Sequence, residues 1–96
     1  MATYQQLLAQ AREEIPEVDA AGLAELLAAS DAPVLIDVRE QSEWDEGYIP
    51  GAVHVSRGFL ESRIAGVARP DTPIVLSCAG GSRSLLAAQA LKAMGY

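Results

Sequence analysis

The residues best suited to chemistry follow a short apolar run in the last quarter of the chain. The run Ile74–Leu76 leads through Ser77 into Cys78, the only cysteine, and a helical Ala/Leu pattern covers residues 84–94. A glycine-containing loop between a strand and a helix can converge its backbone N–H groups on one centre, and the helix N-terminus adds unpaired N–H groups. Such a cradle stabilises a thiolate, so we predict that Cys78 is a nucleophile with a lowered pKa.

The loop after Cys78 is expected to supply the groups that bind the reacting sulfur. Each of its residues has a backbone amide that can face the cysteine: Ala79, Gly80, Gly81, Ser82, Arg83 and Ser84. Arg83 carries the one charged side chain among them. We expect it either to orient an anionic donor or to lock the loop.

A second set of polar residues follows the apolar run Val34–Ile36. Ligands in open α/β sheets bind at the carboxyl ends of strands, so Asp37 should lie at the same end of the sheet as Cys78. Two readings of Asp37 remain open: it braces the loop that carries Cys78, or its carboxylate bonds to its own turn. Arg39 is grouped with Asp37 as a supporting residue, and Glu43, four residues later, is a candidate partner for it.

Other polar residues have simpler interpretations. His54 is a candidate general base for Cys78, but a lone histidine in a short strand is more often structural, and we favour that reading. Three arginines line the segment from Ser56 to Pro70, and we interpret them as a solvated face rather than a docking rim. They are Arg57, Arg63 and Arg69.

The elements that must position these residues can be read from caps and apolar patterns. Thr3 and Gln6 form a capping box for a helix that Pro16 stops. Asp19 is expected to cap a helix over 20–29 that carries an apolar stripe. Ser42 is expected to cap a short helix that ends at Gly47. The two apolar strands lack alternation, which is typical of a parallel sheet buried on both faces. An α/β fold with right-handed crossovers follows.

Composition limits the class of protein. The chain has 96 residues, enough for one small core, and its single cysteine excludes an internal disulfide or a multi-cysteine zinc site. A free thiol suits a reducing compartment, and no run is long enough to span a membrane, so we expect a cytoplasmic protein. The net charge of −6 argues against nucleic-acid binding. Residues 51–96 nevertheless hold five basic and two acidic side chains, which suits anionic donors near Cys78.

Three motifs in this order resemble those of the rhodanese-like sulfurtransferases. They are Asp37–Arg39, Gly47–Ala52 and the loop Ser77–Ser84. The resemblance covers residues 17–96 and implies a three-layer α/β fold with a mostly parallel central sheet flanked by helices. It also implies that a donor passes sulfur to Cys78 as a persulfide, which an acceptor nucleophile then removes. No metal or organic cofactor is expected.

The resemblance also bears on substrates. Rhodaneses that prefer thiosulfate often carry a basic residue directly after the cysteine, where this chain has Ala79. Thiosulfate is therefore one candidate donor, and a protein persulfide or thiocarboxylate pathway is an equal candidate. The expected acceptor is a thiol or cyanide. A sulfur-carrier protein or an adenylyltransferase is a further candidate partner, by fold-level analogy alone. Neither a nucleic acid nor a membrane is expected as a partner.

Two other functions compete with sulfur transfer. A non-catalytic interaction module would keep the fold, but its usual sign is loss of the cysteine, and Cys78 is present. Phosphatases and arsenate reductases with related loops place an arginine six positions after the cysteine. Here Arg83 stands five positions after it. The shorter loop suits the terminal sulfur of a persulfide better than a phosphate, so sulfur transfer is favoured.

We divide the chain into an N-terminal helical extension, residues 1–16, and a rhodanese-like domain, residues 17–96. Rhodanese-like domains usually continue with one more strand and a final helix, so we expect this domain to be incomplete at its C-terminus. An uncovered apolar face or open sheet edge invites pairing, so self-association or membership of a longer protein is expected.

Overall fold

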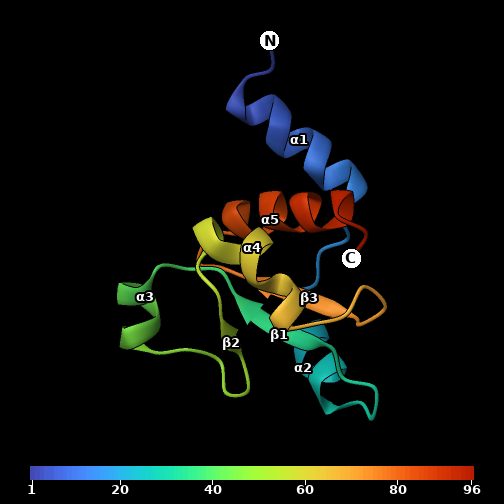
Figure 1. Ribbon diagram of the computed structural model, residues 1–96, viewed down its shortest axis with the longest axis vertical. Coiled ribbons are helices and arrows are strands. Elements are labelled where there is room, and N and C mark those ends of the chain that lie inside the picture. Colours follow the sequence, from blue (N-terminus) through green and yellow to red (C-terminus); the bar gives the residue numbers. More distant parts are fainter.

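A parallel sheet organises the fold. The computed structural model describes all 96 residues, and its strands are β1 (Val34–Asp37), β2 (Val53–His54) and β3 (Ile74–Ser77). All pairings are parallel and the order is β2-β1-β3 (Figure 1). Asp37 lies in register with both His54 and Ser77, so the three strands end at one level. The residues that follow each strand therefore meet along a single edge of the sheet.

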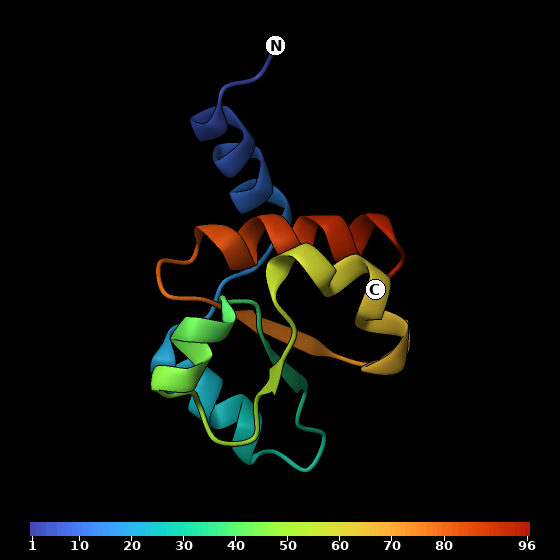
Figure 2. The same ribbon diagram turned by 60° about the vertical axis from the view of Figure 1, so that its left-hand side comes forward.

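Helices cover both faces of this sheet. They are α1 (Tyr4–Glu14), α2 (Ala20–Ala28), α3 (Gln41–Glu46), α4 (Leu60–Arg63) and α5 (Ser82–Ala93), with 3₁₀ turns η1 (Arg57–Phe59) and η2 (Ile64–Gly66) flanking α4. Figures 1 and 2 both place α4 and α5 on one face and α2 on the other. The predicted three-layer α/β architecture is confirmed.

The main core lies between the sheet and the α4–α5 layer. Its buried side chains come from β1, α4, η2, α5 and the segments that follow β1, β2 and η2: Ile36, Val38, Val55, Leu60, Ile64, Ala68, Ala87 and Leu91. Burying a large aliphatic side chain stabilises a fold by about 1.5–3 kcal/mol, so this layer carries most of the apolar stabilisation. Among charged residues only Asp37 is buried, at 3% exposure.

Helix α1 packs outside the three layers. Its capping box between Thr3 and Gln6 forms as predicted. Leu8 and Ala11 of α1 bury against Leu85 of α5 in a second, smaller cluster. In Figures 1 and 2 the helix stands on the side of α5 that faces away from the sheet. None of the helices has the length and hydropathy that a bilayer crossing requires.

Several local predictions were wrong. No residue of α2 is fully buried, so its apolar stripe only partly covers the sheet. Helix α3 is capped by Glu40 rather than Ser42. Helix α5 begins at Ser82, since Gly81 adopts φ +86° and turns the chain into the helix early.

Candidate functional site

Cys78 stands where β3 ends, at the edge shared by all three strands. Its Sγ accepts hydrogen bonds from Gly81 N at 3.1 Å and Ser84 N at 3.3 Å, and it lies 3.4 Å from Ser84 Oγ. The left-handed conformation of Gly81 curls the loop so that these amides face the sulfur. The cysteine is half-buried, whereas Ala79, Gly80 and Gly81 are exposed, so a substrate can approach the sulfur.

Opposing influences act on the Cys78 thiol. Burial raises its pKa, whereas hydrogen bonding with the Ser84 hydroxyl and hydrogen bonds from the N–H groups of Ser84, Gly81 and Gly80 lower it. The hydrogen bonds outweigh burial, and the pKa lies below its ordinary value. Hydrogen bonds to a thiolate favour the charged form, and the thiolate is the reactive nucleophile. The loop can therefore activate Cys78 without a separate general base.

The pH dependence of alkylation tests this account. The rate of Cys78 modification by iodoacetamide should rise with pH and level off below the range of an ordinary thiol, since the thiolate forms earlier. Ser84→Ala should move the midpoint to higher pH, because it removes the hydroxyl that stabilises the thiolate. Ser62→Ala is the matched control, since the Ser62 hydroxyl bonds only to Phe59 O. Equal midpoints in wild type and Ser84→Ala would contradict the account.

Arg83 is held by α3 rather than directed at the sulfur. Its NH1 and NH2 groups donate to the two carboxylate oxygens of Glu43, at 2.6 and 2.9 Å. The Arg83 hydrogen bonds lower the pKa of Glu43 from 4.5 to about 2. Since that pKa is depressed, the pair stabilises the fold above pH 4.5, and this stabilisation is lost as the pH falls toward 2. The bidentate pair ties the start of α5, and hence the loop, to α3.

Asp37 bonds to its own turn. Its carboxylate accepts hydrogen bonds from the Arg39 backbone N, Nε and NH2 at 2.8–3.0 Å, and none from the loop after Cys78. Burial raises the pKa of Asp37, but Arg39 outweighs it and keeps the pKa below its usual range. Arg39 NH2 also donates to Gly47 O at 2.7 Å. Asp37 therefore fixes the end of α3 through Arg39. Arg39 pairs with Asp37 and not with Glu43, so the predicted pairing of Arg39 with Glu43 is wrong.

His54 is a structural residue in this arrangement. Its Nε2 lies 2.8 Å from Arg39 O, a carbonyl that can only accept, so Nε2 carries the hydrogen. Its ring also stacks on Trp44 at 4.9 Å, and Trp44 stacks on Tyr48 at 3.8 Å. Trp44 is half-buried in this stack and is not part of the main core.

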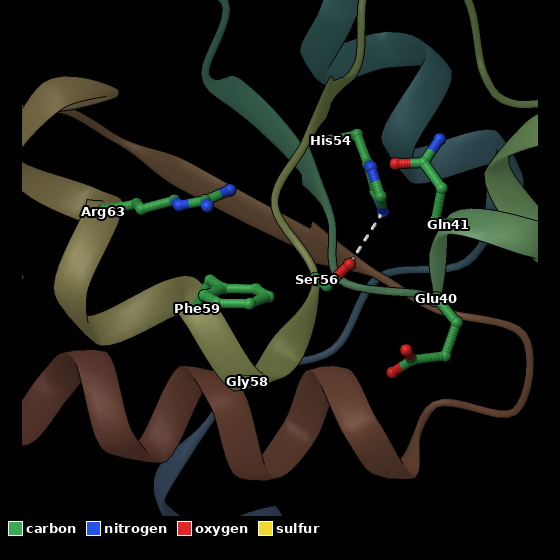
Figure 3. A pocket seen from close by; sticks show the side chains of 7 residues that line it. All are labelled: Glu40, Gln41, His54, Ser56, Gly58, Phe59 and Arg63. Carbon is green, nitrogen blue, oxygen red and sulfur yellow. Dashed lines mark hydrogen bonds between the residues drawn. The ribbon is translucent and has the colours of Figure 1, made fainter.

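Two hollows lie beside the sheet. A groove of about 770 Å³ runs along β3, between α5 and the segment 14–23, and Cys78 is among the residues that line it. A smaller, polar pocket of about 310 Å³ lies beyond the end of β2 and is lined by residues of α3, β2, η1 and α4 (Figure 3). No group of three or more His, Cys, Asp or Glu side chains is arranged to hold a metal ion.

A family model for the rhodanese-like domain matches residues 19–96. The chain belongs to the rhodanese-like domain family. The match spans the sheet, α2 to α5 and the loop after Cys78, and leaves α1 outside. The division at residues 16 and 17 stays a prediction.

Two similar proteins come from Bacillus subtilis. The chain is 36% identical over 83 residues to "Putative sulfurtransferase YtwF" of Bacillus subtilis, covering 86% of this chain and 80% of that protein. It is 32% identical to "Putative sulfur carrier protein YrkF" of the same organism over 85% of this chain, but spans only 44% of that protein's length.

Solved structures show the same fold. A Rhodopseudomonas palustris protein of unknown function, described as a "possible tyrosine phosphatase", has a TM-score of 0.83 and 35% identity, covering 98% of this chain and 78% of that one. A rhodanese-related protein of Thermoplasma volcanium has a TM-score of 0.72 and 27% identity, covering 84% and 77%.

The structure brings together residues that the sequence did not connect. Glu43 and Arg83 are 40 residues apart, and their pairing depends on how α3 packs beside the start of α5. The one sequence signal was an acidic side chain in a short helix following a strand, which does not specify a partner. No sequence pattern indicated the polar pocket beyond β2, because the residues that line it come from four elements.

Proposed function

We propose that this protein is a sulfurtransferase in which Cys78 carries the sulfur. The Cys78 thiolate attacks the outer sulfur of thiosulfate or of a persulfide. The S–S bond of the donor breaks, sulfite or a thiolate leaves with the electron pair, and Cys78 becomes a persulfide. An acceptor thiolate or cyanide then attacks the terminal sulfur, and Cys78 returns to its thiolate form. Oxidation states balance over the two steps, so no cofactor is required.

One observation carries this proposal: backbone amides of a tight loop converge on an accessible cysteine sulfur. Gly81 N and Ser84 N bond to Sγ, and the remaining amides of Ala79, Gly80, Ser82 and Arg83 belong to the same loop and the first turn of α5. Preorganised donors stabilise charge on a reacting atom strongly, because no reorganisation is needed during the reaction. The family and the names of its relatives support this chemistry.

The arrangement of Arg83 supports a locking role over donor binding. Two of its guanidinium nitrogens are engaged by Glu43, which offsets the positive charge beside Cys78. An anionic donor therefore gains little from Arg83, and Ala79 adds no charge. We infer that Asp37 and Arg39 support the loop indirectly, by fixing α3 and so Glu43.

Mass spectrometry tests the proposal directly. Incubation with thiosulfate or with cysteine persulfide should add one sulfur atom to the protein, and peptide mapping should place it on Cys78. Cyanide should then remove the atom as thiocyanate. If neither donor adds sulfur, and both leave the thiol unmodified while the protein is folded, the proposal fails.

A phosphatase activity is less well supported. A phosphate-binding loop needs a guanidinium directed at the phosphate, but Arg83 is bound to Glu43 and stands five positions after Cys78. A non-catalytic interaction module has no need for amides aimed at a half-buried thiol. Hydrolysis of p-nitrophenyl phosphate, measured beside sulfur transfer, distinguishes the first alternative.

A further inference from the structure

A network of charged side chains surrounds the start of α5, beside the loop that carries Cys78. Glu43 of α3 binds Arg83 through two hydrogen bonds of 2.6 and 2.9 Å, and its carboxylate also accepts one from Glu40 N at 3.1 Å. The hydrogen bonds to Glu43 raise the pKa of Arg83, and the nearby charges of Cys78 and Glu40 raise it as well. Arg83 therefore lies within electrostatic reach of the thiolate while another helix holds both of its terminal nitrogens.

The overall charge of this network is negative. Its members, which interact with one another through their charges, are Arg39, Arg83, Asp37, Glu40 and Glu43. Three carboxylates outnumber two arginines, so the network carries a charge of −1 before the thiolate is counted. Figure 3 shows the Glu40 carboxylate directed toward α5. The fold thus brings acidic side chains from residues 37–43 to the loop, where they offset the basic excess of residues 51–96.

This negative charge affects how a sulfur donor approaches Cys78. Thiosulfate carries two negative charges, whereas a persulfide group carries one at most. A site discriminates between ligands when it places a repulsive charge against one of them. Arg83 is the cation that the loop itself carries, and a free guanidinium there would attract thiosulfate. Glu43 already occupies its two terminal nitrogens, so this attraction is withheld.

We propose that Glu43 is a specificity-determining residue that selects persulfide donors over thiosulfate. Glu43 withholds the Arg83 guanidinium from an anionic donor, and its own charge keeps the network negative. The inference rests on the proposed function and names the class of donor for it. With either donor the Cys78 thiolate attacks the outer sulfur, the S–S bond breaks, and sulfite or a thiolate leaves with the electron pair. Selection therefore acts on the charge of the donor and not on the type of reaction.

Two donors that differ by one charge test the selection. Thiosulfate is a dianion, and methanethiosulfonate is a monoanion in which a methyl group replaces one charged oxygen, so that methanesulfinate is the leaving group. The ratio of kcat/KM for thiosulfate to that for methanethiosulfonate should rise by at least about threefold in Glu43→Gln, the range of an exposed charge pair. Glutamine can still accept the hydrogen bond from Glu40 N, so α3 keeps its cap.

Two further variants separate charge from structure. Arg83→Gln combined with Glu43→Gln removes the pair but leaves the net charge unchanged, so its donor ratio should return toward the wild-type value. Glu61→Gln is the matched control, because Glu61 is a carboxylate of α4 that pairs with Arg57 at 2.6 Å, outside the network. An unchanged ratio in Glu43→Gln, an equal rise in Glu61→Gln, or a ratio that stays raised in the double variant would overturn the inference.

Alkylation gives a second readout that does not depend on sulfur transfer. Iodoacetate is anionic and iodoacetamide is neutral, and both alkylate the Cys78 thiolate. The ratio of the iodoacetate rate to the iodoacetamide rate should rise by at least about threefold in Glu43→Gln, because repulsion of the anion is reduced. Loss of loop structure alone would slow both reagents together and leave this ratio unchanged.

The two readouts distinguish the inference from the proposed function. If the wild type loads sulfur but neither ratio changes in Glu43→Gln, the inference is refuted and the proposed function stands. If no donor loads sulfur at a pH at which Cys78 is alkylated, the proposed function fails. The alkylation ratio then still decides whether Glu43 controls the approach of anions to Cys78.

Discussion

Replacing Cys78 by serine is expected to reduce sulfur transfer by at least about 1,000-fold, as removal of a nucleophile does in other enzymes. A hydroxyl is a much weaker nucleophile at neutral pH and cannot form a persulfide. The measurement is the initial rate of thiocyanate formation from thiosulfate and cyanide, together with the mass of the protein after exposure to the donor. No sulfur atom should be added to the variant.

The controls separate chemistry from folding. Cys78 is half-buried and the serine can keep the hydrogen bonds to Gly81 N and Ser84 N, so the thermal unfolding midpoint should change little. Ser62→Ala, on the exposed surface of α4, should leave transfer unchanged. Transfer in Cys78→Ser within a few fold of the wild-type rate would exclude Cys78 as the sulfur carrier.

Inserting one glycine between Gly81 and Ser82 is expected to reduce sulfur transfer by about 100-fold, similar to the loss of one oxyanion-hole donor. The insertion moves Ser84 N away from Cys78 Sγ and changes how Arg83 meets Glu43, so both the amide cradle and the lock are disturbed. It also places the arginine six positions after the cysteine. Sulfur transfer and the binding of vanadate, a phosphate analogue, are the two measurements, and vanadate binding should increase.

The matched control is a glycine inserted between Ser30 and Asp31. This exposed turn precedes β1 and so lies at the opposite end of the sheet from Cys78. The control variant should transfer sulfur at nearly the wild-type rate, because an insertion at an exposed turn costs little folding free energy. If the insertion after Gly81 transfers sulfur as fast as this control does, convergence of the amides is not what stabilises the persulfide.

Much of the fold follows from local sequence. The strands β1 and β3 are continuous apolar runs, which suit a sheet covered on both faces, and their parallel pairing follows from the helices between them. The caps at Thr3 and Asp19 were predictable because a capping side chain bonds to an amide only three residues away. The start of α5 was less predictable, because Gly81 was one of two glycines able to make the turn.

The candidate nucleophile and the type of site could both be predicted from the sequence. A single cysteine after an apolar strand, followed by glycines and a helix, predicts a thiol surrounded by amides. The partners of the charged residues were decided only by tertiary structure, because they come from elements far apart in the chain. Arg83 pairs with Glu43 rather than facing a donor, and Asp37 bonds to Arg39 rather than to the loop. The polar pocket beyond the end of β2 depends on the same packing, since the four elements that line it meet only when the sheet has formed.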